Sequence, residues 1–237
     1  MAAPLTTARN KYTENEKNST IYTPKGVCDF IYDLLYVFVC NTLVEEKKTI
    51  IVDTSVGSGN LLRPFISNLL LHRFLGYDTN NDLDRPQKID FAKKNFLKLK
   101  KIDVADYKDK VGLVIQNPPF NNTEESREFL KSIKKGKSLL PELFLDKTWE
   151  LYGEDVPCIC ITPHGTRLNQ RVYEKDSRRI SRRRGKRYRK VRDGWPKISS
   201  IISLPLDIFP CVEFHVEILI FNIWGLDPHY MLPEKYF

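Results

Sequence analysis

Short apolar runs alternate with amphipathic segments along most of the chain. The runs at residues 47–55 (KKTIIVDTS), 74–78 (FLGYD), 110–116 (KVGLVIQ) and 157–163 (PCICITP) predict buried strands, because each is short, apolar and bounded by polar or turn residues. A weaker run at residues 100–104 (KKIDV) predicts a further short strand, the third in chain order.

Helical spacing of apolar residues fills the intervals between these runs. Residues 24–46 predict a helix with Pro24 in its first turn, and residues 56–74 predict a glycine-rich turn followed by a helix. Two more helices are predicted at residues 84–99 and 140–153. Strands that alternate with helices are typical of a parallel sheet covered on both faces.

The C-terminal part departs from this alternation. The apolar runs at residues 198–205 (ISSIISLP) and 213–224 (EFHVEILIFNIW) follow each other without a helix between them, which favours an antiparallel pair. The predicted fold is α/β, a mostly parallel twisted sheet with helices on both faces and an antiparallel hairpin at its C-terminal edge. A single domain over residues 21–237 can bury a full core, and residues 1–20 predict a flexible polar segment.

The basic charge of the chain is concentrated in one segment, within an insertion at residues 175–193. The formal net charge is +8, and residues 178–192 carry ten Lys or Arg and no acid, so the remainder sums to +8 − 10 = −2. This pattern favours contact with a polyanion such as nucleic acid, although a solvated loop or a localisation tract would have the same composition. The candidate nucleic-acid-binding residues are Arg178, Arg179, Arg182, Arg183, Arg184, Lys186, Arg187, Arg189, Lys190 and Arg192.

The sequence argues against a membrane protein, a secreted protein and a metal-binding protein. No apolar run approaches the roughly 20 residues of a membrane span, and the N-terminal residues lack the apolar core of a signal peptide, so we expect a cytoplasmic protein with no membrane partner. The five cysteines form no CxxC pair and the four histidines are scattered, so no metal site is predicted.

A glycine-rich turn joins the first predicted strand to its helix. Gly57 and Gly59 follow Asp53 in the sequence DTSVGSG, and glycines at such a turn let the backbone approach a ligand above the helix N-terminus. Asp78 ends the next predicted strand, where a carboxylate can accept hydrogen bonds from ribose hydroxyls. The turn alone is a weak signal, because Leu62 stands where a dinucleotide fingerprint has its third glycine.

The sequence NPPF directly follows the strand predicted at residues 110–116. Proline cannot donate to a sheet ladder, so Pro118 and Pro119 end the strand in a rigid corner and hold Asn117 and Phe120 at its end. Open α/β sheets bind their ligands at that edge.

In order and spacing these motifs resemble those of S-adenosylmethionine-dependent adenine-N6 DNA methyltransferases. The likeness is strongest to the catalytic core of the modification subunits of type I restriction systems, and it covers roughly residues 21–224. The motifs are Tyr22-Thr23-Pro24, the turn from Asp53 to Gly59, Asp78, Asp103 and Asn117-Pro118-Pro119-Phe120, with ITPHGTRL at residues 161–168 and the run at residues 201–221 in support.

The resemblance implies a Rossmann-like class I methyltransferase that binds S-adenosylmethionine and methylates a flipped-out adenine of DNA. By resemblance, Asn117 and the Pro118 carbonyl accept from the amine, next to Pro119, and Phe120 stacks on the base. The implied cofactor-binding residues are Asp53, Gly57 and Gly59 for the methionine part, Asp78 for the ribose, Asp103 or alternatively Asp106 for the adenine, and Tyr22, Thr23 and Pro24 as a cover.

Two departures and two alternatives accompany the resemblance. Thr54 stands where the family usually has proline, and nothing that resembles a target recognition domain follows the core. Sequence choice in type I systems belongs to a separate specificity subunit. The expected partners are therefore DNA and either such a subunit or a second copy of the chain, unless the basic segment itself grips the DNA. The alternatives are a methyltransferase for an RNA base or a protein glutamine, and a non-catalytic nucleic-acid-binding subunit.

Overall fold

The computed structural model describes residues 22–120, 140–164, 166, 195–209 and 215–237. The predicted N-terminal segment and the basic insertion lie outside the described residues, so both stay predictions.

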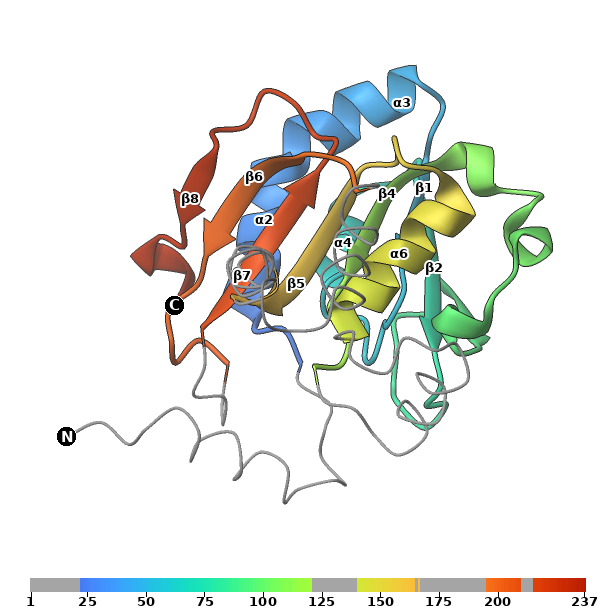
Figure 1. The fold of residues 1–237 in the computed structure, drawn as a ribbon, viewed down its shortest axis with the longest axis horizontal. Helices are drawn as coiled ribbons and strands as arrows, with labels where there is room; N and C mark the ends of the chain where they lie inside the picture. Colours follow the sequence, from blue (N-terminus) through green and yellow to red (C-terminus); the bar gives the residue numbers. More distant parts are fainter. Residues whose placement is uncertain (1–21, 121–139, 165, 167–194, 210–214) are drawn as a thin grey trace, which may run out of the picture.

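One twisted sheet of eight strands forms the centre of the described structure (Figure 1). The strand order is β3-β2-β1-β4-β5-β7-β6-β8, and β7 runs antiparallel to both of its neighbours while the other pairs are parallel. The strands are β1 (Ile50–Asp53), β2 (Arg73–Asp78), β3 (Ile89–Lys93), β4 (Val111–Gln116), β5 (Cys158–Pro163), β6 (Ile198–Ser203), β7 (Val216–Phe221) and β8 (His229–Met231).

Helices cover the two faces of this sheet (Figure 1). On one face lie α2 (Lys25–Val37), which continues through the π-helical turn η2 (Phe38–Thr42) into α3 (Leu43–Glu45), and α4 (Arg63–Asn68). The opposite face carries α6 (Leu140–Tyr152) with the 3-10 turns η3 (Phe96–Lys98), η4 (Lys101–Val104) and η5 (Lys108–Lys110). A last 3-10 turn, η6 (Glu234–Tyr236), contacts α2.

The central strands are apolar at nearly every position because both of their faces are buried. In β4, Leu113 and Ile115 join the core under α2 and α4, whereas Val114 joins the core under α6. All three are fully buried, and each side chain of this size stabilises the fold by roughly 1.5 to 3 kcal/mol. Burial on both faces explains why the strands could be recognised as uninterrupted apolar runs.

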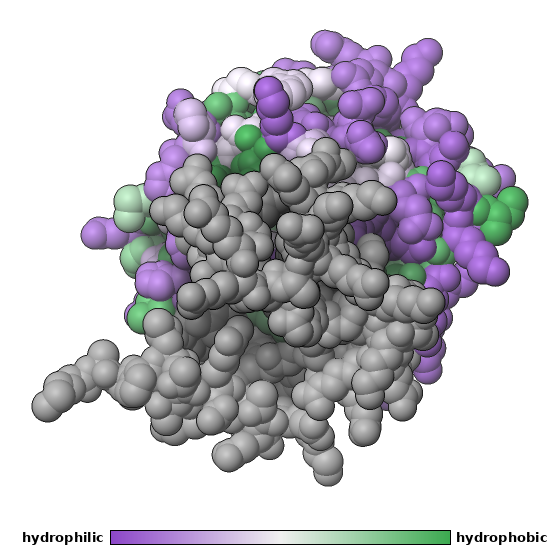
Figure 2. Space-filling view, viewed as in Figure 1, coloured by the Kyte–Doolittle hydropathy of each residue, from purple (hydrophilic) through white to green (hydrophobic). Residues whose placement is uncertain are grey.

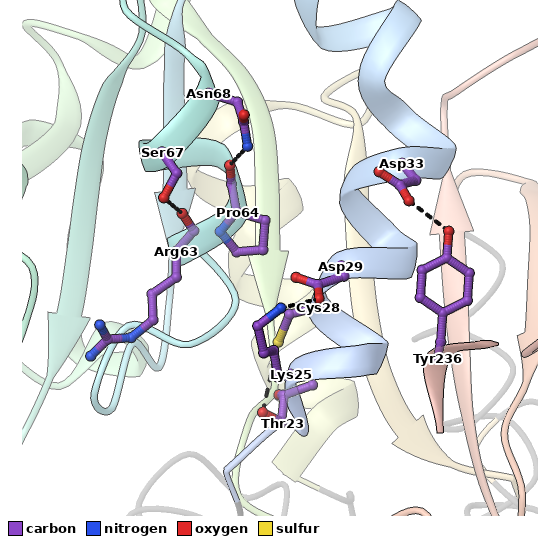
Figure 3. A network of polar contacts seen from close by, with 10 residues as sticks. All are labelled: Thr23, Lys25, Cys28, Asp29, Asp33, Arg63, Pro64, Ser67, Asn68 and Tyr236. Carbon is purple, nitrogen blue, oxygen red and sulfur yellow. Dashed lines mark hydrogen bonds and ion pairs between the residues drawn. The ribbon is translucent and has the colours of Figure 1, made fainter. Parts of the chain in front are cut away.

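The C-terminal turn packs against α2 and fixes its position. The Tyr236 hydroxyl donates to the Asp33 carboxylate at 2.6 Å, as Figure 3 shows. Gly26 allows this close packing, because a Cβ there would lie 1.7 Å from the Tyr236 carbonyl oxygen. The residues that precede α2 are therefore anchored on a rigid part of the fold.

The helix from Lys25 to Glu45 corrects one sequence-based expectation. Its 21 residues are long and apolar enough to cross a membrane by length and composition, contrary to the expectation that no segment would be. Within its most apolar stretch 44% is buried inside the protein, and core helices of soluble proteins pass the same test. The finding is therefore weak evidence for a membrane span.

The sequence predictions hold for most of the sheet. The strands predicted at residues 47–55, 74–78, 110–116 and 157–163 are confirmed as β1, β2, β4 and β5, and the antiparallel C-terminal pair is confirmed as β6 and β7. The short strand β8 was missed, and it lies beyond the pair at the sheet edge.

Two predictions between β2 and β4 are wrong. Residues 84–99 were expected to form a helix but contain β3, in which the buried Ile89 and the half-buried Phe91 alternate with exposed Asp90. Residues 100–104 were expected to form a strand but contain η4, because the Asp103 carboxylate accepts from the Lys100 N–H and caps a helical turn. The third strand therefore lies about ten residues earlier than predicted.

Candidate active site

The predicted site residues collect at one edge of the sheet. Strands β1, β2, β4 and β5 are parallel, so their carboxyl ends share one edge, which is the lower edge in Figure 1. Asp53 and Asp78 are the last residues of β1 and β2, and Asn117 directly follows β4. The structure thus brings together three positions that are up to 64 residues apart (117 − 53 = 64).

Thr23 is the junction between the three motifs. It is 3% exposed, and its hydroxyl accepts a hydrogen bond from Asn117 Nδ2 at 3.1 Å. Its carbonyl accepts from Asn60 Nδ2, in the turn after Gly59, at 3.3 Å. In Figure 3 it lies at the start of α2, where Cys28 Sγ also donates to its carbonyl. The Tyr-Thr-Pro segment therefore holds the glycine turn and the NPPF motif together.

The NPPF motif forms the corner that its prolines predict. Pro118 is buried and Pro119 is exposed, while Phe120 is partly buried against the core under α2. The Asn117 amide is oriented by its bond to Thr23, since Nδ2 is the donor and Oδ1 is thereby identified as the acceptor end.

The buried Thr54 hydroxyl holds the turn that follows β1. Its hydroxyl donates to Gln116 Oε1 at 2.9 Å, and both residues are buried. Gln116 Nε2 in turn donates to Cys158 Sγ at 3.5 Å. This buried polar bridge links β1, β4 and β5 directly beneath Asn117, and sequence reasoning had noted Thr54 but not its partner.

The two glycines of the turn have backbone conformations that other residues rarely adopt. Gly57 and Gly59 have φ values of +50° and +79°, in the left-handed region that favours glycine. A Cβ on Gly57 would lie 3.5 Å from the ring of Tyr22, and a Cβ on Gly59 would meet Ile89 at 2.7 Å. Tyr22 is 41% exposed and lies on the solvent side of the turn, and its role as a cover for the cofactor stays a prediction.

Asp78 and Arg85 hold the two loops beside this turn. Asp78 Oδ2 accepts from the Gly57 N–H at 2.8 Å, and its Oδ1 accepts from the Asn80 N–H at 2.9 Å. A carboxylate has about four acceptor sites, so ribose hydroxyls can still bind there. Arg85, which sequence reasoning missed, donates to the carbonyls of Gly57 and Asn80 at 2.6 Å each and stacks 3.9 Å from the Phe91 ring centre.

Asp53 is a carboxylate placed where water does not reach. It is 1% exposed, and burial raises its pKa to about 7, with the Asp78 carboxylate adding to the rise and the Ser55 N–H opposing it. The folded-state pKa therefore lies above the ordinary value, and the neutral carboxyl is favoured at acid pH. A cationic ligand would favour the ionised form.

We predict that Asp53→Asn stabilises the fold while weakening cofactor binding. Because the pKa is raised to about 7, the unfolded chain ionises before the folded one, so stability falls as pH rises from about 4 to about 7, and Asn removes this cost of at most about 4 kcal/mol. Thermal melts at about pH 4 and about pH 8 measure the stability. Calorimetric titration with S-adenosylmethionine measures affinity, and the ratio of wild-type to variant affinity should rise about tenfold between roughly one pH unit below and above 7.

The exposed Asp109→Asn serves as the control for that experiment. A pH-independent affinity ratio, or an Asp53→Asn variant that melts below the wild type at alkaline pH, would contradict the assignment.

Asp103, the residue expected to bind the adenine of the cofactor, does not lie at the end of a strand. Asp103 was proposed on a strand that does not exist, and its carboxylate accepts from the Lys100 N–H at 2.8 Å and pairs with Lys94 at 3.5 Å. The Lys100 N–H is the main cause of its lowered pKa. Asn95 lies two residues beyond the true end of β3, and its side chain accepts from the Leu97 N–H. Alternation at Ile89 and Phe91 was the signal that could have located this strand.

Comparison with solved structures identifies the fold class. No protein-family model matches the chain, and no curated protein matches it. A Listeria monocytogenes protein described as a class I S-adenosylmethionine-dependent methyltransferase has a similar structure, with a TM-score of 0.53, 15% identity and coverage of 94% of this chain and 70% of that one. The fold is that of a class I methyltransferase.

Two further solved structures share this methyltransferase fold. One is a type I restriction-modification methyltransferase subunit from Streptococcus thermophilus, with a TM-score of 0.50, 15% identity and coverage of 89% of this chain and 47% of that one. The other is the type IIL restriction-modification enzyme MmeI in complex with DNA, with a TM-score of 0.57, 14% identity and coverage of 89% and 38%. The chain spans less than half of either protein, and identities this low establish the fold alone.

The ten candidate nucleic-acid-binding residues at 178–192 lie outside the described residues, so their role stays a prediction. On the face that Figure 2 shows, hydrophilic residues dominate the described surface and hydrophobic ones form small separate groups.

Proposed function

We propose that the protein transfers a methyl group from S-adenosylmethionine to the N6 amine of adenine in DNA. The observation that carries this proposal is Asn117, whose amide is held at the carboxyl end of β4 by Thr23, beside a glycine turn with a left-handed backbone. The methyltransferase fold supports the cofactor class, and two structural neighbours from restriction-modification systems support DNA as the substrate class.

The residues fit the proposed cofactor. Gly57 and Gly59 give the turn its left-handed backbone, and Asp78 ends β2 where ribose hydroxyls would lie. Asp53 is a buried carboxylate, and a bound methionine ammonium group would favour its ionised form. Bound S-adenosylmethionine supplies an electrophilic methyl group on a sulfonium sulfur.

Positioning is the main contribution of the protein to such a reaction. The N6 lone pair of adenine is delocalised into the ring, so the amine is a poor nucleophile. Hydrogen bonds from the amine to Asn117 Oδ1 and the Pro118 carbonyl would favour a pyramidal nitrogen that faces the methyl carbon, with Phe120 stacked on the base. A nitrogen–carbon bond forms as the carbon–sulfur bond breaks, and the amine loses one proton to water.

A base inside a duplex cannot reach this edge of the sheet, so the proposal includes base flipping. Extrusion costs a few kcal/mol, and stacking on an aromatic ring returns roughly 1 to 3 kcal/mol. The remainder must come from contacts with the DNA backbone, for which the basic segment at residues 178–192 is the candidate.

The test is a substrate panel with labelled S-adenosylmethionine. Duplex DNA, single-stranded DNA, RNA and a glutamine-containing peptide are offered in parallel to the full chain. We expect label in DNA. Label confined to RNA or to the peptide would replace DNA by that substrate, and absence of both transfer and cofactor binding would favour a non-catalytic nucleic-acid-binding subunit.

A further inference from the structure

A histidine and a buried glutamate form a second polar cluster at the same edge of the sheet. His164 directly follows β5, and its Nδ1 lies 3.1 Å from Glu217 Oε2 of β7. The Glu217 side chain is 1% exposed, whereas that of His164 is 44% exposed. The backbone N–H of His164 also donates to the His215 carbonyl at 2.9 Å, which fixes the main chain that carries the imidazole.

Glu217 interrupts a strand that is otherwise apolar. All six residues of β7 are buried, and Glu217 is the one charged residue among VEILIF. Its cross-strand neighbour Thr162 is also buried, with a hydroxyl that has no hydrogen-bond partner in the described part of the chain. Burying a carboxylate is costly, and breaks of the apolar pattern of this kind collect at functional sites.

The pair has the arrangement of an oriented imidazole. A carboxylate oxygen accepts hydrogen bonds, so the Nδ1–H tautomer of His164 donates to Glu217 Oε2. The carboxylate thereby fixes the orientation of the ring, as carboxylates do for histidines in other sites. When the half-exposed ring is charged, its Nε2 side is available to donate to an anion.

The sheet register indicates which part of a substrate this ring would meet. Gln116 of β4 is paired with Cys160 of β5, so Asn117 lies level with Ile161. His164 follows three residues later, roughly 10 Å farther out along the strand direction. That separation is close to the distance between the exocyclic amine of a nucleotide and its own backbone phosphate.

We propose that His164 donates a hydrogen bond to a backbone phosphate beside the target nucleotide, with Glu217 as its positioning residue. The inference rests on the proposed function, because it takes Asn117 as the point where the amine binds. His164 would hold the strand from which the base is extruded, and so supply local contact energy that the base pocket lacks.

The experiment measures binding of an unmethylated DNA duplex over a series of salt concentrations at about pH 5.5, where an ordinary imidazole is charged. His164→Gln should weaken binding about tenfold and lower the slope of log affinity against log salt by about 0.9, the value for a single phosphate contact. His164→Arg should restore the slope, because it restores the charge and the donor. His229→Gln, on the edge strand β8, is the matched control and should change neither quantity.

Glu217→Gln separates positioning from simple charge. Removing a negative charge near a polyanion should by itself tighten binding, so weaker binding with unchanged cofactor affinity supports the orienting role. Melting curves of all variants exclude unfolding as the cause.

If the wild-type chain methylates DNA and His164→Gln has the same affinity and salt slope, this inference is overturned and the proposed function stands. A wild-type chain that neither binds nor methylates DNA would overturn both.

Discussion

Asn117→Ala is expected to lower the rate of methyl transfer at least about a hundredfold while leaving affinity for S-adenosylmethionine nearly unchanged. The residue follows β4 at the edge of the sheet, and its proposed role is to orient the substrate amine. Loss of the amide removes that acceptor, and no other change in the strand is required because the side chain is already partly exposed. Single-turnover transfer and calorimetric titration measure the two quantities.

Two further variants make the result specific. Thr23→Val keeps the shape of its side chain but removes the hydroxyl that accepts from Asn117 Nδ2, so a smaller loss of rate is expected. Asn68→Ala removes an exposed amide at the end of α4 and should behave as wild type. Full transfer activity in Asn117→Ala would contradict the catalytic role of Asn117. Loss of cofactor binding in that variant would mean that Asn117 helps to bind the cofactor and does not act on the substrate amine alone.

Replacing the ten basic residues of the segment 178–192 by Ser or Gln is expected to weaken DNA binding at least about a hundredfold at low salt. Each phosphate contact releases counterions, so the dependence of affinity on salt should flatten in proportion to the number of phosphate groups that the variant no longer binds. Cofactor affinity should not change, because the predicted cofactor residues belong to other segments. Fluorescence anisotropy with labelled duplex DNA measures both affinity and slope.

A neutral replacement of Lys108 and Lys110 is the control, because η5 precedes β4 and therefore lies near the opposite edge of the sheet from the site. An unchanged salt slope after replacement of residues 178–192 would return that segment to the status of a solvated loop.

The parts of the fold that could be predicted are those determined by local pattern. Buried strands such as β4 can be recognised in the sequence as apolar runs. The left-handed backbone of Gly57 and Gly59 is expected for glycines in a turn between a strand and a helix. β3 was missed because it is half exposed and its polar residues also fit a helix. η4 was taken for a strand because a capping carboxylate at Asp103 has no strong signature in so short a segment.

The contacts that assemble the site could not be predicted, because they join residues far apart in the chain. Thr23 and Asn117 are 94 residues apart, and their hydrogen bond depends on the placement of α2 against the sheet. Thr54 could be noted as a departure from the family pattern, but its partner Gln116 is 62 residues away and buried on another strand. The pairing of His164 with Glu217 likewise requires the antiparallel register of β5 and β7.

The measurement that tests the central claim most directly is the identity of the methylated nucleoside. Unmethylated duplex DNA is incubated with the protein and isotopically labelled S-adenosylmethionine, then digested and analysed by mass spectrometry. We expect labelled N6-methyldeoxyadenosine, and at least about a hundredfold less of it when Asn117→Ala replaces the wild type. Label in a different nucleoside, or the same yield of N6-methyldeoxyadenosine from the variant, would contradict this expectation.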